Sequence, residues 1–558
     1  MKNRILRYYR GFSFVGLAVA ALLFAASVTP SLLPRHYVTQ GLLSGFALAV
    51  GYGLGVVMVW CYQFFELPSP SRGVEYFSKR ITTVLVAATF LVCLRNMTFW
   101  QNSIRKLMEM PDLETAYPFR AALIAIVFGA VLIAAARTLI ACGMFLFRRI
   151  NRYVPPRVAV ATSGLLVGFI TLFLVNGVVA RGLLALADSV SLRADELIEE
   201  GMEMPTDPLA CGSEESLVQW DSIGRQGKKF LTDGPTSQSI AELWGAIKTS
   251  QPPEQQPIRV YVGMRSRDSE QERAELALQE LKRVGAFDRS VLIVATPTGT
   301  GWLDPSAVDT LEYLHAGDTA IVATQYSYLP SWITILVDPQ RSIRSARHLF
   351  REVYDHWTTL PKDSRPRLYL FGLSLGALGS EQSADIYTIL EDPIQGAVWS
   401  GPPFPSSQWA NMTESRQAGS PAWLPKFQDG RLLRFTGRLN SLDVDRPWGK
   451  IRNVYLQHAS DPMVFFRSDL WRRQPEWLTD RRGPDVSPYL VWYPIVTALQ
   501  IAFDLPMATT VPLGYGHNYS PQGYLNAWIA VTDPDAWDSA DNQQLIDTVM
   551  KRFAESDD

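Results

Sequence analysis

The pattern of hydrophobic and polar positions divides the chain into two regions. Before about residue 186, long apolar runs alternate with short charged loops, whereas the rest mixes short apolar runs with scattered Asp, Arg and Pro residues. A run of about 20 apolar residues can cross the roughly 30 Å of bilayer hydrocarbon as a helix. The pattern therefore predicts a membrane-embedded helical domain at residues 1–186, followed by a globular domain.

About five transmembrane helices are predicted in the first region. The apolar runs lie near residues 11–28, 41–65, 81–94, 121–147 and 158–179. The third run is short for a span. After the fifth run, apolar positions recur on one face of a helix, which predicts a stalk helix at the start of a linker region at 187–256.

Positive charges determine the expected orientation. Lys and Arg cluster before the first run, before the third run and between the fourth and fifth runs: Lys2, Arg4, Arg7, Arg10, Lys79, Arg80, Arg148, Arg149, Arg152 and Arg157. Because these clusters fall on one side of the membrane, we expect an integral protein of the inner, cytoplasmic membrane with its N-terminus in the cytoplasm. An odd number of spans then places the globular domain in the periplasm or outside the cell. Arg137, inside the fourth run, is interpreted as an interfacial residue whose stem snorkels.

The globular domain, residues 257–558, shows alternating strand and helix patterns. Strands are predicted at 258–262, 291–295, 320–324, 368–371, 396–400 and 454–457, and helices at 270–284, 307–314, 339–357 and 377–390. This alternation predicts a mostly parallel sheet covered by helices on both faces, with functional groups at the carboxyl ends of the strands. Two aromatic-rich insertions, around 403–450 and 464–510, are expected to form a cap over that edge, to close the domain or to meet the membrane.

Composition narrows the functional classes. The net charge of −2 and the lack of a basic tract argue against nucleic acid as a partner. Three of the four cysteines lie in apolar runs, so Cys211 cannot form a disulfide within the globular domain. No metal-binding motif is present, and the Gly-x-Gly at Gly299 lacks the Lys-Ser/Thr of a phosphate loop. We therefore expect neither a metal nor a cofactor.

The stretch "LYLFGLSLGALGS", residues 368–380, carries the strongest chemical signal. A strand is followed by Gly-x-Ser-x-Gly and then by a helical pattern, which is typical of a nucleophile elbow. Gly372 and Gly376 lack the Cβ atoms that would clash at the sharp turn, so the hydroxyl of Ser374 is presented instead of packed. Ser374 is the predicted nucleophile.

A serine nucleophile needs a base and an acid that orients it, in the chain order Ser, Asp or Glu, His. His517, in the turn "VPLGYGHNYS", is the favoured base, and His458 is the alternative. Asp461, just past the strand predicted at 454–457, is the favoured acid. The reserve acids are Asp443 and Asp445.

Acyl transfer also needs donors for the oxyanion. The backbone N–H of Leu375, directly after the nucleophile, is one candidate. The loop "ATPTGTGWLDP" follows an early strand and offers further backbone donors at Thr298, Gly299 and Thr300.

Several stretches together resemble a known family, the bacterial membrane-anchored α/β-hydrolases with a multi-span N-terminal domain. The resemblance extends over most of the chain and is carried by "ESLVQWDSIGRQGKKF", "PIRVYVGMRS", "ATPTGTGWLDP", "TQYSYLPSW", "GLSLG", "YLQHASDP", "RRGPDVSPYLVWYP" and "GYGHNY". It implies an α/β-hydrolase fold with Ser374, Asp461 and His517 as the triad, but it supplies no substrate. Leu373 departs from the Glu expected in the family's elbow, which puts the pocket wall in doubt but not the nucleophile.

We therefore expect a membrane-anchored serine hydrolase that cleaves an ester, with a lipid or an acylated envelope component as substrate. Protein partners are not indicated. Two alternatives stay open: an acyltransferase with the same triad, and a non-catalytic binding or transport-associated protein. The transport alternative would predict paired intramembrane charges or broken helices, and Arg137 is the single such charge found.

Overall fold

The computed structural model describes residues 11–556, apart from residues 69, 173–194, 196–201, 248–254, 480 and 535–536. The chain forms two compact units. The helical unit comprises Met1–Ala185, Phe466–Thr479 and Pro484–Met507, and the sheet unit comprises Leu186–Phe465, Asp480–Gly483 and Ala508–Asp558. Most of the second insertion therefore belongs to the helical unit and not to the sheet unit that it interrupts.

The sheet unit contains one seven-stranded sheet in the order β1-β3-β2-β4-β5-β7-β6. Its strands are β1 (Ile258–Val262), β2 (Val291–Thr296), β3 (Thr319–Thr324), β4 (Arg367–Leu373), β5 (Gly396–Ser400), β6 (Leu433–Thr436) and β7 (Arg452–Leu456). Every pairing is parallel, so the carboxyl ends of the strands lie at one edge. The predicted parallel sheet is confirmed. The pattern missed β6, a four-residue strand inside the first insertion.

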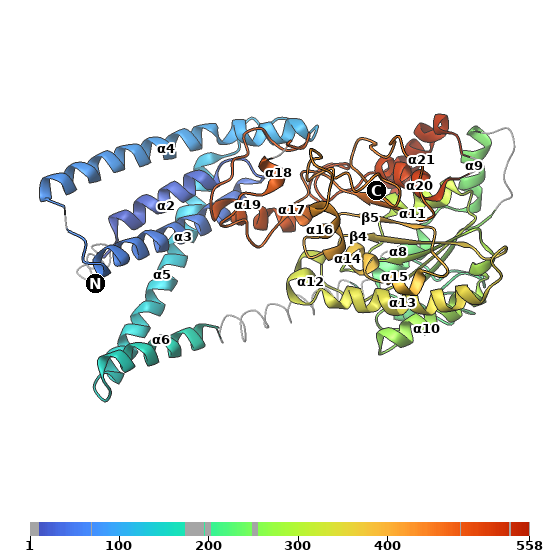
Figure 1. Ribbon diagram of the computed structural model, residues 1–558, viewed down its shortest axis with the longest axis horizontal. Coiled ribbons are helices and arrows are strands. Elements are labelled where there is room, and N and C mark those ends of the chain that lie inside the picture. Colours follow the sequence, from blue (N-terminus) through green and yellow to red (C-terminus); the bar gives the residue numbers. More distant parts are fainter. Residues whose placement is uncertain are drawn as a thin grey trace. The chain divides into compact units, whose positions relative to one another are not determined.

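Helices cover both faces of this sheet (Figure 1). On one face lie α10 (Glu270–Arg283), α13 (Gln340–Thr359), α14 (Leu375–Glu381) and α15 (Ile386–Ile389), and on the other α11 (Pro305–Leu314), α20 (Pro521–Thr532) and α21 (Asn542–Ser556). The remaining helices are α8 (Arg225–Thr232), α9 (Ser237–Ile247), α12 (Ser331–Val337), α16 (Ser407–Glu414) and α17 (Pro462–Phe465), with the 3-10 turns η2 (Trp220–Ser222), η3 (Ala286–Asp288) and η5 (Ser539–Asp541). The helix predicted at 377–390 is divided, because the Asp385 side chain accepts the N–H of Tyr387 and starts α15 anew.

The helical unit is built from α2 (Phe14–Ser27), α3 (Tyr37–Phe64), α4 (Arg72–Leu107), α5 (Pro118–Ile150), α6 (Pro156–Leu172), α18 (Glu476–Thr479), α19 (Val496–Asp504) and η4 (Leu505–Met507). Among the described helices, α3, α4 and α5 are long and apolar enough to cross a membrane, which indicates membrane association. The predicted third span is short, yet α4 has 36 residues. Capping by Ser71 and a Glu75–Lys79 ion pair let the helix begin before its apolar run.

Some predictions for this region fall outside the described residues. The basic cluster at Lys2–Arg10, the end of the fifth apolar run and nearly all of the predicted stalk helix lie there. Arg137 is described, and its guanidinium lies 4.5 Å from the centre of the Phe12 ring. Arg137 belongs to α5, and Phe12 lies just before α2. This cation–π contact gives Arg137 a role in packing within the helical unit.

Small residues allow α3 to pack closely on two neighbours. A Cβ atom at Gly51 or Gly55 would lie within 2.8 Å of the Cα of Ala20 or Gly16 in α2. On another side, a Cβ at Gly45 would lie 2.8 Å from the Ala125 carbonyl oxygen of α5. The backbones of α2, α3 and α5 therefore approach closely, as in small-residue packing of membrane helices.

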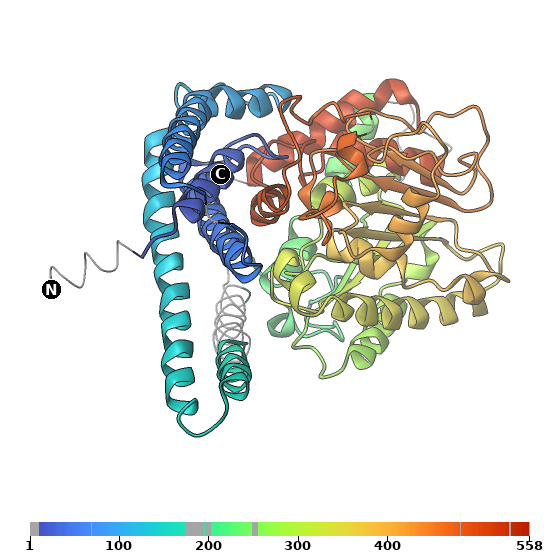
Figure 2. The ribbon, with the colours of Figure 1, turned by 60° about the vertical axis from the view of Figure 1, so that its left-hand side comes forward.

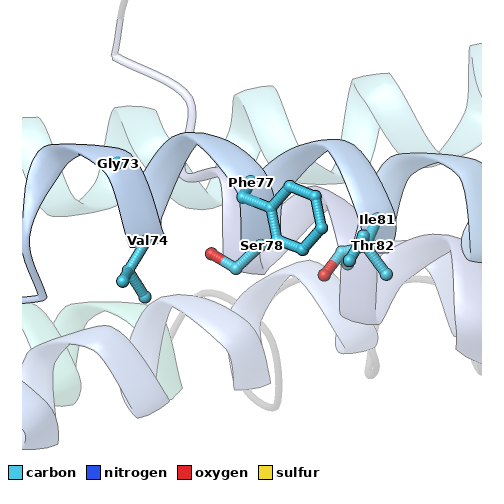
Figure 3. Close-up of a pocket in the computed structure, with 6 residues that line it drawn as sticks. All are labelled: Gly73, Val74, Phe77, Ser78, Ile81 and Thr82. Atoms are coloured by element: carbon cyan, nitrogen blue, oxygen red, sulfur yellow. The ribbon is translucent and has the colours of Figure 1, made fainter.

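The outer surface of α4 is apolar along its first turns. Val74, Phe77 and Ile81 are exposed, and Figure 3 shows them with Ser78 and Thr82 around a shallow hollow on this single helix. Such a surface suits contact with lipid chains. The Ser78 hydroxyl donates to the Glu75 carbonyl oxygen at 3.0 Å, and no His, Asp, Glu or Lys is among the residues that line the hollow.

Candidate active site

The predicted elbow is formed at the carboxyl end of β4. Ser374 separates β4 from α14 and has φ 58° and ψ −126°, a region that non-glycine residues rarely occupy. A Cβ on Gly372 would strike the Gly376 carbonyl oxygen, and a Cβ on Gly376 would strike the Thr296 carbonyl oxygen. The two glycines are therefore required for this strained turn, which is the kind of backbone strain found at functional sites.

The hydroxyl of Ser374 is not used for structure. The backbone N–H of Ser374 donates to the Ser400 carbonyl oxygen at 2.9 Å, which fixes the elbow to the end of β5. The side chain is only 3% exposed, and within the described residues its Oγ has no hydrogen-bond partner. A buried hydroxyl without a partner is costly unless it serves a reaction or a ligand.

Asp461 and His517 form a pair 56 residues apart in sequence. His517 Nδ1 lies 2.6 Å from Asp461 Oδ2. Asp461 is fully buried, and its other oxygen, Oδ1, accepts the Met463 N–H at 2.8 Å. The Tyr519 hydroxyl donates to Oδ2 at 2.7 Å. The carboxylate therefore has its orientation fixed by donors on both oxygens.

This pairing determines which ring nitrogen of His517 can act as a base. When Nδ1–H donates to Asp461, Nε2 is left as the acceptor. Within the described residues Nε2 is buried and has no hydrogen-bond partner. Burial, and after it the negative charge of Asp461, raise the pKa of Tyr519 well above its usual value, so Tyr519 stays a hydrogen-bond donor.

Ser374 and His517 both lie against the end of β5, at the consecutive residues Ser400 and Gly401. The backbone N–H of Ser374 donates to the Ser400 carbonyl oxygen. The His517 ring packs so closely on Gly401 that a Cβ atom on Gly401 would strike Cε1 of the imidazole. Because both Ser374 Oγ and His517 Nε2 are without partners, the hydrogen bond between them is not formed here. Catalytic hydrogen bonds are often long before substrate binds.

The alternative candidates have other surroundings. His458 Nδ1 lies 2.9 Å from the Gly516 carbonyl oxygen, and its ring stacks on Tyr519 at 4.5 Å between centroids. His458 thus supports the loop that carries His517. The two reserve acids, Asp443 and Asp445, are both exposed on a loop.

The loop expected to supply oxyanion donors lies beside the start of α14. A Cβ on Gly376 would contact the carbonyl oxygens of both Thr296 and Pro297, so the two backbones touch there. Leu375 is the first residue of α14, where backbone N–H groups have no partner within the helix. The predicted Leu375 donor and the loop are therefore neighbours.

Within that loop the three predicted donors differ. The N–H of Thr298 donates to the Trp302 carbonyl oxygen at 2.9 Å, and the N–H of Gly299 donates to Ser331 Oγ at 3.0 Å. Among the described hydrogen bonds, none uses the N–H of Thr300. Of the three, Thr300 is thus the residue whose N–H is not used within the described residues, while the N–H groups of Thr298 and Gly299 stabilise the loop.

The described residues contain no group of three or more His, Cys, Asp and Glu side chains arranged to hold a metal ion.

Two family models match the chain. A model of the alpha/beta-hydrolase family covers residues 258–545, and a model of the N-terminus of that family covers residues 28–235. The chain belongs to the alpha/beta-hydrolase family. No curated protein and no solved structure matches it.

In this α/β-hydrolase, sequence reasoning missed three residues that surround the site. Tyr519 bonds to Asp461, and Gly401 makes room for the His517 ring. The Tyr524 hydroxyl lies 2.9 Å from Oγ of Ser400, the residue whose carbonyl oxygen accepts the Ser374 N–H. The two tyrosines follow His517 closely in the sequence, so aromatic hydroxyls next to a candidate base were an available signal.

Asp304 is a buried acid at the end of the loop that follows β2. Its carboxylate caps α11 by accepting the Ser306 N–H at 2.9 Å, and it also bonds to the Tyr524 hydroxyl. Burial raises the pKa of Asp304 to about 7, against the lowering effect of these hydrogen bonds. Near neutral pH the carboxyl group of Asp304 is therefore partly protonated. It is linked to the Ser400 hydroxyl through the Tyr524 hydroxyl, by two successive hydrogen bonds.

This acid predicts a pH dependence of stability. Because its folded-state pKa lies above the ordinary value of 3.8, the folded protein holds the proton more tightly than the unfolded chain. The contribution of Asp304 to the free energy of unfolding is expected to be fully present below about pH 4 and to be lost between about pH 4 and about pH 7, by on the order of 4 kcal/mol. Asp304→Asn, which cannot ionise, should flatten this slope.

Thermal unfolding of the detergent-solubilised protein at about pH 5 and about pH 8 measures the effect. The buried Glu381, whose pKa is also raised to about 7 by burial, contributes a slope of the same sign in both proteins. Only the difference between wild type and Asp304→Asn therefore reports on Asp304. Identical slopes would contradict the prediction.

Proposed function

We propose that this protein is a membrane-anchored serine hydrolase that cleaves an ester through an acyl-enzyme. One observation carries the proposal: a buried Asp461–His517 pair and a strained, buried Ser374 leave Nε2 and Oγ without partners next to the same stretch of chain. Neither atom has a structural use. Ser374 Oγ must be free to attack, and His517 Nε2 must be free to accept its proton, if the two are to act as nucleophile and base.

The reaction follows from these positions. Ser374 Oγ attacks the ester carbonyl while His517 Nε2 takes its proton, and Asp461 stabilises the imidazolium that forms. The N–H groups of Leu375 and Thr300 donate to the tetrahedral oxyanion. His517 then protonates the leaving alkoxide, and water activated by the same nitrogen hydrolyses the acyl-enzyme.

We propose a lipid or an acylated envelope component as the substrate, because three helices are long and apolar enough to cross a membrane, which supports a site close to lipid. The inner membrane, with the sheet unit in the periplasm or outside the cell, is the location that the loop charges favour. Lipid analysis of a deletion strain would identify which esters accumulate.

Labelling with a fluorophosphonate probe tests the chemistry. The probe should modify Ser374 in the wild-type protein and should leave Ser374→Ala unlabelled, since only an activated serine reacts. Peptide mapping locates the modified residue. A folded wild-type protein that the probe does not label would contradict the proposal.

The same reaction tests the location. A charged fluorophosphonate that does not cross membranes should label intact spheroplasts as fully as lysed ones if the sheet unit lies outside the cytoplasm. Labelling that requires lysis would place the sheet unit in the cytoplasm while leaving the proposed chemistry intact.

A further inference from the structure

Two buried tyrosines bind the loop that is proposed to supply an oxyanion donor. We call residues 297–301 the oxyanion loop. The Tyr261 hydroxyl donates to the Gly301 carbonyl oxygen at 2.7 Å, and the Tyr326 hydroxyl donates to the Pro297 carbonyl oxygen at 3.0 Å. Tyr261 lies in β1 and Tyr326 follows β3, which pairs with β1. Both ends of the oxyanion loop are therefore fixed to neighbouring strands of the sheet unit.

The two phenol groups are suited to this role because they keep their protons. Tyr261 and Tyr326 are only 0% and 2% exposed. Burial raises the pKa of each phenol above its ordinary value of 10. Both therefore stay hydrogen-bond donors at neutral pH. Loss of either hydroxyl would leave a backbone carbonyl oxygen of the oxyanion loop without that donor, which is costly for a buried group.

Ser342 links Tyr326 to the residue that carries the other proposed oxyanion donor. Ser342 lies in α13 and is fully buried. Its hydroxyl donates to the Leu375 carbonyl oxygen, in the first turn of α14, at 2.7 Å. It also interacts with the Tyr326 hydroxyl. Figures 1 and 2 both show α13 beside α14. Two buried hydroxyl groups thus form a bridge between Pro297 of the oxyanion loop and Leu375 of α14.

This bridge spans the place where the oxyanion loop meets the elbow. A Cβ on Gly376 would lie 2.7 Å from the Pro297 carbonyl oxygen, and a Cβ on Gly379 would strike Ser342 Oγ. The start of α14 is therefore packed tightly against both sides of the bridge. Two donors can stabilise one oxyanion only when their separation is fixed, because each must lie about 2.7–3.1 Å from that oxygen.

We propose that Tyr326 and Ser342 are positioning residues for the proposed ester hydrolysis. Together they hold the oxyanion loop against the start of α14, through the carbonyl groups that they bind. The N–H groups of Thr300 and Leu375 are thereby fixed relative to one another. This inference rests on the proposed function. It predicts that loss of the bridge weakens stabilisation of the oxyanion and leaves proton transfer by His517 intact.

Acylation by a matched ester and thionoester separates these two effects. In the thionoester, sulfur replaces the carbonyl oxygen and is a weak hydrogen-bond acceptor, so the N–H donors stabilise its intermediate much less. In the full-length, detergent-solubilised protein, Tyr326→Phe should lower the single-turnover rate for the ester about tenfold and the rate for the thionoester less than about twofold. Removal of a whole oxyanion donor costs about 100- to 1,000-fold, and here the donors are displaced and not removed.

Ser342→Ala removes the other half of the bridge and should lower the ester-to-thionoester ratio in the same direction. Because both side chains serve one bridge, the double variant with Tyr326→Phe should lose about as much as the more damaging single variant, and not the product of the two losses. A wild-type ratio in both single variants would overturn the inference. So would losses that multiply in the double variant.

Tyr354→Phe is the matched structural control. Tyr354 is also a buried tyrosine of the sheet unit, and its hydroxyl donates to the Asp392 carbonyl oxygen at 2.9 Å, before the start of β5 and away from the elbow. Its loss should lower the melting temperature without changing the ester-to-thionoester ratio.

Asp461→Asn is the control for proton transfer, which both substrates need, so it should lower both acylation rates alike. If Tyr326→Phe also lowers both rates alike, its hydroxyl has a merely structural role and the inference is overturned. A wild-type protein that is neither labelled by the fluorophosphonate nor acylated by the ester would instead refute the proposed function.

Discussion

Replacement of Asp461 by Asn is expected to lower kcat for an ester by about four orders of magnitude. The surroundings of the side chain explain the size of this effect. Oδ1 accepts the Met463 N–H, so the amide oxygen of the Asn must take that position. Its NH2 group then replaces Oδ2 and donates to His517 Nδ1. The ring proton is forced onto Nε2, which can no longer accept the proton of Ser374.

Tyr519→Phe is the matched control for this variant. It removes one donor to the same carboxylate oxygen but leaves the acid charged, so a loss of about tenfold is expected. Both variants should melt within a few degrees of the wild type, and kcat and KM are measured with one chromogenic ester. An Asp461→Asn protein that keeps a tenth or more of wild-type kcat would exclude Asp461 as the acid that orients the base.

The elbow could be predicted from sequence because its causes are local. A β-strand, two glycines at fixed spacing and a following helix all lie within residues 367–381. Steric exclusion at Gly372 and Gly376 depends only on nearby backbone and on the adjoining strand β2. The parallel sheet followed from periodicity in the same way, although the short β6 gave too few alternating positions to be recognised.

The parts that sequence could not settle depend on long-range contacts. Whether Gly299 or Thr300 offers a free N–H is determined by Ser331, which is 32 residues away and takes the Gly299 donor. The choice between His458 and His517 is likewise made by the partners that each ring finds. His458 meets a backbone carbonyl, whereas His517 meets a carboxylate.

The second insertion, around residues 464–510, shows the same limit at a larger scale. Its aromatic and apolar composition suits a cap, a domain closure or a membrane contact equally well. Most of it belongs to the helical unit, where α19 contacts α2 and α3 and Asp504 pairs with Arg35, far away in the sequence. No local pattern around "IAFDLP" distinguishes an acid that is paired in the interior from one that is solvated.

Gly376→Ala is expected to remove both labelling and much of the stability of the sheet unit. The added Cβ would strike the Thr296 carbonyl oxygen and lie 2.7 Å from that of Pro297. Both are backbone atoms, so relief requires the end of β2 and the start of the oxyanion loop to move. Overpacking that side chains can relieve costs about 1–3 kcal/mol, and a backbone clash should exceed that range.

Gly523→Ala in α20 is the control for adding a methyl group to a glycine of the same unit. Its Cβ would lie 3.3 Å from the Leu456 side chain, which can rotate away, so a change of less than about 1 kcal/mol is expected. Thermal unfolding and fluorophosphonate labelling are compared for the two variants. If Gly376→Ala melts and labels like Gly523→Ala, the loop after β2 is not fixed against α14. The oxyanion donors proposed at Leu375 and Thr300 would then have no common geometry.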